Sequence, residues 1–228
     1  MVAPTIKFCI PTCKTHSPGT IDVIVPSLIS CGIIPTDIIV VEGGNELREY
    51  TKNKYGIQYI KTNHNSFDYT AFIDIVENTI ETDFIFNIHD TCKVGMQFLN
   101  LVNKANFSLL KTALYHNTYN GASMAMGLIN YQYLMLHKQL IQSFKNIDYS
   151  SQGLKQAKYK AVTIEDKLFW ELKDVECGKF AQGLDRKEIG TESPYQTGTP
   201  RLVEYYETLD LYKYKANWGQ TSDFIYAL

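Results

Sequence analysis

Acidic side chains occur in this sequence where a strand or helix is expected to begin or end. They are Glu42, Asp68, Asp90, Glu165 and Asp166. A carboxylate in such a position can hold a cation or accept a proton from a reacting hydroxyl group. The apolar run FIFNI at residues 84–88 ends abruptly in His89-Asp90-Thr91. This polar trio either only begins a loop or holds a charged group at the end of a buried strand.

Strands and helices are expected to alternate through the first hundred residues. Apolar runs predict strands at 5–10, 37–42, 57–62 and 83–91, and helical patterns predict helices at 17–32, 45–56 and 67–80. This alternation predicts an α/β fold with a mostly parallel sheet and helices on both faces. Ligands bind at the carboxyl ends of the strands in such sheets. We therefore expect three polar strand ends to meet in one crevice: Pro11-Thr12, Glu42-Gly43-Gly44 and His89-Asp90-Thr91.

The second half of the chain has a less regular pattern. Helices are expected at 96–110, 129–144 and 162–175, and a strand at 121–129. Residues 178–201 are rich in Gly, Thr, Ser and Pro without periodicity, which predicts a long loop. The aromatic tail after this loop is expected to wrap the body of the protein.

Charge and cysteine content exclude several classes of function. With 22 basic and 24 acidic residues the net charge is −2, and no basic stripe is present. Nucleic acid is therefore not expected as a partner. The five scattered cysteines form no complete zinc pattern and indicate free thiols in a cytoplasmic protein. No apolar run approaches the ~20 residues that a transmembrane segment needs.

Several well-known motifs are missing from the sequence. There is no G-x-x-x-x-G-K-[ST] phosphate loop and no G-x-G-x-x-G dinucleotide fingerprint. GASMA around Ser123 nearly matches a nucleophile elbow, but Ala125 occupies the place of the second glycine. His137 is the last histidine, and no acid lies between it and Ser123. An α/β-hydrolase is therefore not expected.

The order of the strand-end motifs resembles the GT-A glycosyltransferases, in particular the large inverting family 2. The motifs are KFCIPTCKTH at 7–16, DIIVVEGGNE at 37–46 and FIFNIHDTCKVGMQFL at 84–99. Proteins of that family typically have an IPT strand end, a VVDDGS strand end and an acidic D-x-D or H-D-D strand end. GASMAMGLI followed by IEDKLFWEL at 164–172 is similar to the acceptor-side strand and the ED helix of the family. The resemblance covers roughly residues 5 to 172, by pattern and order rather than by identity.

The resemblance implies one GT-A-like domain over residues 1–228. Residues 1–100 would bind the nucleotide sugar, and residues 101–228 would bind the acceptor and include the tail. The implied reaction moves a sugar from a nucleotide-diphosphate donor to a hydroxyl of a glycan or another acceptor, with inversion. Mn²⁺ or Mg²⁺ would assist it, and the loop predicted at 178–201 would close over the donor.

The resemblance also implies roles for individual residues. Pro11 and Thr12 would border the base and ribose, and Glu42 would replace the aspartate that usually contacts them. Asp68 and His89 would be further residues of the nucleotide-binding site. Asp90 would hold the metal ion. Asp166, supported by Glu165, would remove the proton from the acceptor hydroxyl.

Each of these positions also has a plain structural interpretation. Pro11 can simply end a strand, Glu42 can be an exposed acid at a turn, and Asp68 can cap a helix. His89 and Asp90 can form a hydrogen-bonded pair at a strand end. Glu165 and Asp166 can simply stabilise the N-terminus of a helix through its dipole, without a role in catalysis.

The acidic strand end departs from the family pattern, which keeps other functions open. Thr91 stands where the second carboxylate is expected, and no histidine follows His137. A non-catalytic nucleotide- or carbohydrate-binding relative fits such a site. A sugar-nucleotide pyrophosphorylase fits less well, because its Gly-rich, basic N-terminal phosphate loop is missing. An unrelated α/β scaffold without a small-molecule site is the remaining alternative.

Overall fold

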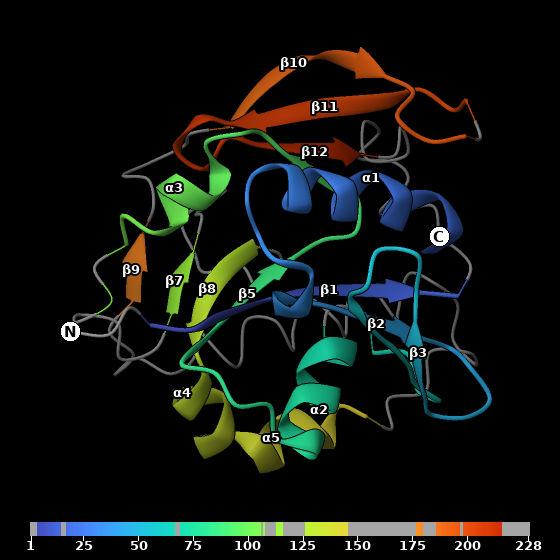
Figure 1. Cartoon of the computed structure of the whole chain (residues 1–228), viewed down its shortest axis with the longest axis vertical. Coiled ribbons are helices and arrows are strands. Elements are labelled where there is room, and N and C mark those ends of the chain that lie inside the picture. Colours follow the sequence, from blue (N-terminus) through green and yellow to red (C-terminus); the bar gives the residue numbers. More distant parts are fainter. Residues whose placement is uncertain are drawn as a thin grey trace, which may run out of the picture.

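The computed structural model describes residues 4–14, 17–66, 69–105, 107, 113–115, 126–145, 177–179, 186–196 and 198–215. In this part of the chain a large sheet has the strand order β3-β4-β2-β1-β5-β8-β7-β9 (Figure 1). The strands are β1 Ile6–Cys13, β2 Ile38–Gly43, β3 Glu49–Lys52, β4 Gln58–Lys61, β5 Phe84–Ile88, β7 Ala113–Tyr115, β8 Met126–Asn130 and β9 Cys177–Lys179. A second sheet has the order β10-β11-β12-β6, with β6 Cys92–Val94, β10 Arg186–Glu192, β11 Arg201–Tyr206 and β12 Leu211–Lys215.

The centre of the large sheet is parallel. Strands β4, β2, β1 and β5 are neighbours and run in the same direction, while β3 and β8 pair antiparallel at either side. Helices cover both faces: α1 Ser17–Ser30 and α3 Phe98–Val102 on one, and α2 Tyr69–Asn78, α4 Tyr131–Leu136 and α5 Lys138–Ser143 on the other (Figure 1). The predicted α/β fold with a mostly parallel sheet between helices is confirmed.

Alternation along the central strands explains how both faces are buried. Phe8 and Ile10 of β1 pack with Ile24 and Leu28 of α1, whereas Cys9, between them, packs with the α2 side. Since successive side chains of a strand point to opposite faces, a continuous apolar strand requires cover on both sides. The apolar runs in the sequence therefore predicted these strands correctly.

The helix predicted at 45–56 is wrong. Residues 49–52 form β3, which pairs antiparallel with β4 through Tyr50↔Ile60 and Thr51↔Tyr59. The turn between these strands ends at Gly56, whose φ of +72° favours glycine. Aromatic and β-branched residues suit a strand, and pairing with β4 decided the conformation.

Two predictions for the second half also need correction. The long helix predicted at 129–144 is two short helices, α4 and α5, separated at His137. The loop predicted at 178–201 contains β9 and β10 instead, and the aromatic tail supplies β11 and β12.

A buried ion cluster joins three strands of the small sheet. The Glu204 carboxylate on β11 is fully buried, with Arg186 of β10 at 3.1 Å and Lys215 of β12 at 2.6 Å. These three charges from neighbouring strands compensate one another, and their pairing across strands could not be inferred from sequence periodicity.

Two other sequence expectations were examined in the described residues. Cys9, Cys13, Cys31 and Cys92 are free thiols, as expected. Among the helices of the described ranges, none has the length and apolar character needed to cross a membrane.

Candidate functional site at the strand ends

The carboxyl ends of β1, β2 and β5 bring three of the predicted residues to one edge of the sheet. Thr12 of β1 is the register partner of Glu42 of β2. The Thr12 hydroxyl donates to Oδ2 of Asp90 at 2.6 Å, and Asp90 lies two residues after the end of β5. Thr20, in the first turns of α1, also donates to Oδ2 of Asp90, at 3.0 Å. Asp90 is therefore held by two threonine hydroxyls from different elements.

Glu42 is a buried acid with hydroxyl partners. Only 6% of its surface is exposed, so the alternative of an exposed acid at a turn is wrong. The hydroxyls of Ser17 and Tyr59 both donate to Oε2. Burial alone would raise the pKa of Glu42, but these hydrogen bonds favour the ionised form and bring the pKa below its usual value. This edge of the sheet therefore holds a carboxylate that stays ionised at neutral pH.

Glu42 has several side-chain partners. The hydroxyls of Ser17 and Tyr59 bond Oε2, and the Asn45 side chain also helps to lower the pKa of Glu42. Tyr59 also lies close enough to Asp90 for that carboxylate to contribute, after burial and Glu42, to raising the tyrosine pKa. A ligand at this edge would therefore meet the carboxylates of Glu42 and Asp90, both held by hydroxyl groups.

The turn after β2 is held against the loop that follows β4. Gly44 N donates to His64 O at 3.1 Å, and Asn45 N donates to Thr62 O at 3.0 Å. A Cβ on Gly43 would lie 2.8 Å from His64 O, so any side chain there would require the backbone to move. Gly43 is thus required for close packing of two loops beside the crevice.

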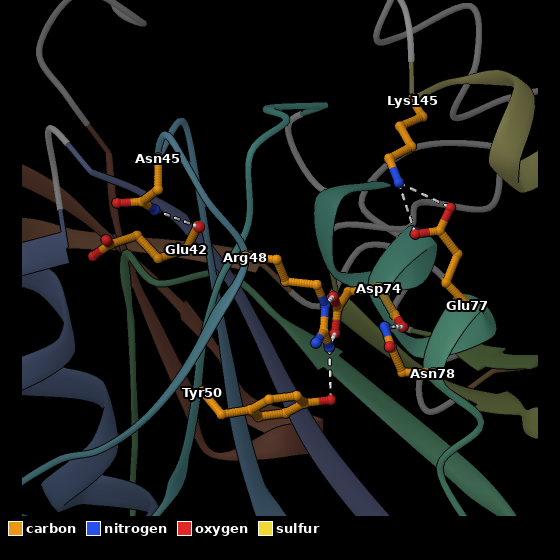
Figure 2. A network of polar contacts seen from close by, with 8 residues as sticks. All are labelled: Glu42, Asn45, Arg48, Tyr50, Asp74, Glu77, Asn78 and Lys145. Carbon is orange, nitrogen blue, oxygen red and sulfur yellow. Dashed lines mark hydrogen bonds and ion pairs between the residues drawn. The ribbon is translucent and has the colours of Figure 1, made fainter.

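A polar network connects this turn to α2 (Figure 2). Asn45 Nδ2 donates to the backbone oxygen of Glu42 at 2.9 Å. Arg48 forms a two-pronged ion pair with Asp74 of α2, with distances of 2.8 Å and 3.2 Å, and also donates to the Tyr50 hydroxyl. Asp74 is 1% exposed, so Arg48 compensates a buried charge and anchors the segment that leaves Glu42.

The other predicted residues do not all join this cluster. Pro11 is buried within β1 opposite Val41, and His89 is half-buried at the end of β5. Asp68, Glu165 and Asp166 lie outside the described residues. The predicted base Asp166 and its supporting Glu165 are therefore not part of the cluster described here.

The residues at this edge were tested for their fit to a divalent cation. Within the described ranges, no group of three or more His, Cys, Asp or Glu side chains is arranged to hold a metal ion. Asp90 offers carboxylate oxygen, which suits Mn²⁺ and Mg²⁺. A cation would fit here with Asp90 as a protein ligand if phosphate oxygens of a substrate supplied further ligands.

Sequence reasoning missed four residues around the cluster. Ser17, Thr20 and Tyr59 supply hydroxyl donors, and Tyr195 packs against α1 near Gly19. Ser17 and Thr20 could have been found, because a helix that follows β1 must begin at the same edge of the sheet. The position of Tyr195 depends on the small sheet, which the sequence analysis did not predict.

A cavity lies between α1 and the small sheet, away from the strand-end cluster. Its volume is about 730 Å³, and the residues that line it include Val23, Ser27, Lys93, Asp210 and Tyr212. None of the described residues that line it is a predicted site residue. Asp210, one of its lining residues, accepts hydrogen bonds from Gln97 N and the Tyr205 hydroxyl. We regard the strand-end cluster as the candidate site because it lies at the carboxyl edge of the parallel strands, where such sheets bind ligands.

The fold and this cluster define an α/β domain with a polar cluster at the carboxyl end of a parallel sheet. No protein-family model matches the chain. No curated protein matches it either.

Solved structures match part of the chain. The glycosyltransferase GlyE of Streptococcus pneumoniae TIGR4 aligns over 76% of this chain and 45% of its own, with 14% identity and a TM-score of 0.47. Its apo form gives 12% identity and a TM-score of 0.45 over the same shares. S. aureus TarS 1–349 aligns over 75% of this chain and 67% of its own, with 12% identity and a TM-score of 0.40. The aligned region thus spans less than half of GlyE, and we base the proposal below on the site itself.

Proposed function

We propose that this chain binds a nucleotide-diphosphate sugar at the strand-end crevice and transfers the sugar to an acceptor hydroxyl with inversion. The acceptor is a glycan or another hydroxyl compound. The observation that carries the proposal is the meeting of Thr12, Glu42 and Asp90 at the ends of three parallel strands. Ligand sites of parallel α/β sheets lie at this edge. The ordered strand-end motifs that resemble GT-A glycosyltransferases give independent support.

Glu42 and Asp90 take different roles in this proposal. Glu42 accepts a hydrogen bond from the ribose or the base, while Ser17 and Tyr59 hold its carboxylate in place. Asp90 would hold a divalent cation, which would supply stabilisation for the negative charge of the leaving diphosphate. Thr12 and Thr20 orient the Asp90 carboxylate.

The transfer step itself needs a base. The acceptor oxygen attacks the anomeric carbon, the bond from that carbon to the diphosphate oxygen breaks, and the diphosphate leaves with the electron pair. The proton of the acceptor hydroxyl passes to a carboxylate. We assign this role to Asp166, supported by Glu165, on the basis of the ED motif in the sequence.

A thermal-shift panel tests donor binding. UDP-, GDP-, CMP- and dTDP-linked sugars are each added with and without Mn²⁺, and the melting temperature is recorded. A ligand at 100 times its Kd stabilises the folded state by about 2.7 kcal/mol. We expect one nucleotide class to raise the melting temperature in a Mn²⁺-dependent way. Absence of any shift across the panel would contradict the proposal.

A non-catalytic nucleotide- or carbohydrate-binding protein is the second candidate function. It is favoured by Thr91, which supplies a hydroxyl where a second carboxylate is expected at the metal site. Release of nucleotide diphosphate, measured for Asp90→Asn and Asp166→Asn, separates the two candidates. An enzyme loses turnover with either substitution, whereas a binding protein has no turnover and loses at most affinity with Asp90→Asn.

A further inference from the structure

The Tyr195 hydroxyl is a buried polar group that the proposed site does not yet use. Tyr195 is 6% exposed, and its hydroxyl oxygen is buried without a hydrogen-bond partner among the residues that the structure describes. A buried hydroxyl that lacks a partner destabilises the folded state. Such a group calls for an explanation, and one explanation is a partner that arrives only when a ligand binds.

Tyr195 packs against two elements that hydrogen-bond the segment containing Asp90. On one side, a methyl group at Gly19 would lie 3.9 Å from Tyr195 Cβ, and the next residue, Thr20, donates to Asp90. On the other side, the Tyr195 ring packs edge-on against Tyr214, with ring centroids 6.1 Å apart. The backbone N–H of Tyr214 donates to the carbonyl of Thr91 at 2.9 Å, directly after Asp90. Tyr195 thus contacts both α1 and β12, the two elements whose hydrogen bonds hold Asp90 and Thr91.

The segment around Tyr195 is well anchored. Gly198 N donates to Tyr195 O at 3.0 Å, the Ser193 hydroxyl donates to Gly198 O at 3.1 Å, and the Arg201 guanidinium lies 5.6 Å from the Tyr195 ring centroid. The negative charge of Asp90 is close enough to contribute, after burial, to raising the pKa of the Tyr195 hydroxyl. A neutral phenol held rigidly near an acid is suited to donate a hydrogen bond to it.

We propose that Tyr195 is a positioning residue of the donor site, whose hydroxyl hydrogen-bonds the Asp90 carboxylate when nucleotide-diphosphate sugar and a divalent cation are bound. This inference rests on the proposed function. In the ligand-free protein both threonine hydroxyls bond Oδ2 of Asp90. When the carboxylate turns toward a cation, the phenol becomes the donor that fixes its new orientation. Carboxylates that hold metal ions are commonly oriented in this way, and loss of the outer partner weakens metal affinity about 10–100-fold.

The test compares Tyr195→Phe with Tyr214→Phe. Tyr214 is a matched control because it is 2% exposed, touches Tyr195 and has a partnered hydroxyl, which donates to Glu192 at 3.0 Å. Three quantities are measured: the melting temperature without ligand, the Kd of the nucleotide sugar selected by the thermal-shift panel, and the Mn²⁺ concentration at half-maximal binding. A role in packing alone would not change the third quantity.

We expect opposite patterns for the two variants. Tyr195→Phe should keep or raise the melting temperature without ligand, weaken the Kd about tenfold and raise the Mn²⁺ requirement by a similar factor. Tyr214→Phe should lower the melting temperature and leave the Kd within about twofold.

Two results would overturn the inference while the proposed function stands. One is an unchanged Kd and Mn²⁺ requirement in Tyr195→Phe. The other is a loss of ligand-free stability in Tyr195→Phe equal to that of Tyr214→Phe, which would show that the hydroxyl already has a structural partner, such as a buried water. If the wild-type protein binds no nucleotide sugar, the proposed function itself fails, and the inference fails with it.

Discussion

The Thr12 hydroxyl lies 2.6 Å from Oδ2 of Asp90, although 78 residues separate the two in sequence. This hydrogen bond joins the end of β1 to the segment that follows β5. It shows why the apolar strand β5 is followed by polar residues: Asp90 accepts a hydrogen bond from a hydroxyl on the neighbouring strand β1. The same bond fixes one of the carboxylates to which we assign donor binding.

Substitution of Thr12 by valine tests this hydrogen bond. Valine keeps the shape and removes the hydroxyl, which leaves a half-buried carboxylate with one donor fewer. We expect a loss of about 1–2 kcal/mol in the free energy of unfolding, measured by urea denaturation. Thr51→Val is the control, because the Thr51 hydroxyl makes only a 3.5 Å contact with Tyr59 O on the edge of the sheet. Equal effects of the two substitutions would contradict a special role of Thr12.

Glu42→Gln should make stability less dependent on pH. The folded-state pKa of Glu42 lies below its usual value of 4.5, because hydroxyl hydrogen bonds outweigh the effect of burial. Its contribution is therefore complete above pH 4.5 and is lost as the pH falls through the folded-state pKa. We expect Glu42→Gln to lower stability by about 1–3 kcal/mol at pH 7 and by progressively less as the pH falls toward 3.

Urea denaturation of wild type and Glu42→Gln across this pH range gives the difference directly. Glu81→Gln, at an exposed acid near the opposite end of β1, is the matched control and should show a small difference at every pH. We expect the difference in the free energy of unfolding between wild type and Glu42→Gln to become smaller as the pH falls. A difference that becomes larger as the pH falls would contradict a lowered pKa of Glu42.

Arg48→Met tests the ion pair that anchors the segment after Glu42. Removal of the guanidinium leaves the Asp74 carboxylate buried without its two-pronged partner, so we expect a loss of about 2–4 kcal/mol. The pKa of Arg48 is raised by hydrogen bonding to Asp74, which agrees with a strong pair. Lys54→Met removes the surface ion pair with Asp22 at 2.9 Å and should have a far smaller effect on the thermal midpoint. Similar midpoints for the two variants would show that burial of Asp74 does not strengthen the pair.

Gly43→Ala should disturb the crevice through sterics alone. The added Cβ would lie 2.8 Å from His64 O and 3.2 Å from the Cα of Asn65, so a backbone segment must move. We expect a loss of about 1–3 kcal/mol in denaturant unfolding. Gly56→Ala is a useful comparison, because its φ is +72° but the space around it is open. It should cost about 1 kcal/mol through backbone strain and leave ligand binding unchanged, whereas Gly43→Ala should weaken binding as well.

The sequence was sufficient to predict the central strands and the edge at which Thr12, Glu42 and Asp90 meet. Buried parallel strands are continuous apolar runs, and their polar ends mark the ligand edge directly. The partners of these acids could not be predicted in the same way. Tyr59 reaches Glu42 from β4, which was predicted as a strand. Its antiparallel partner β3 was predicted as part of a helix, because strand pairing is not visible in helical periodicity.

The small sheet was missed for a similar reason. β10 lies in a segment rich in turn residues, and the sheet buries both apolar side chains such as Val203 and the charge of Glu204, which Arg186 and Lys215 contact from neighbouring strands. The sequence pattern does not show this pairing. Tyr195 reaches the donor site through this sheet, so its position also required the structure.

The most direct test of the central claim is calorimetric titration with the nucleotide sugar that the thermal-shift panel selects, in the presence of Mn²⁺. Wild-type protein is compared with Asp90→Asn and with Asp37→Asn, whose aspartate pairs with Lys7 near the opposite end of β1. We expect a Kd at least tenfold weaker for Asp90→Asn, no change for Asp37→Asn, and loss of the Mn²⁺ dependence in Asp90→Asn alone. Binding that is equally tight in all three proteins would show that the strand-end crevice is not the donor site.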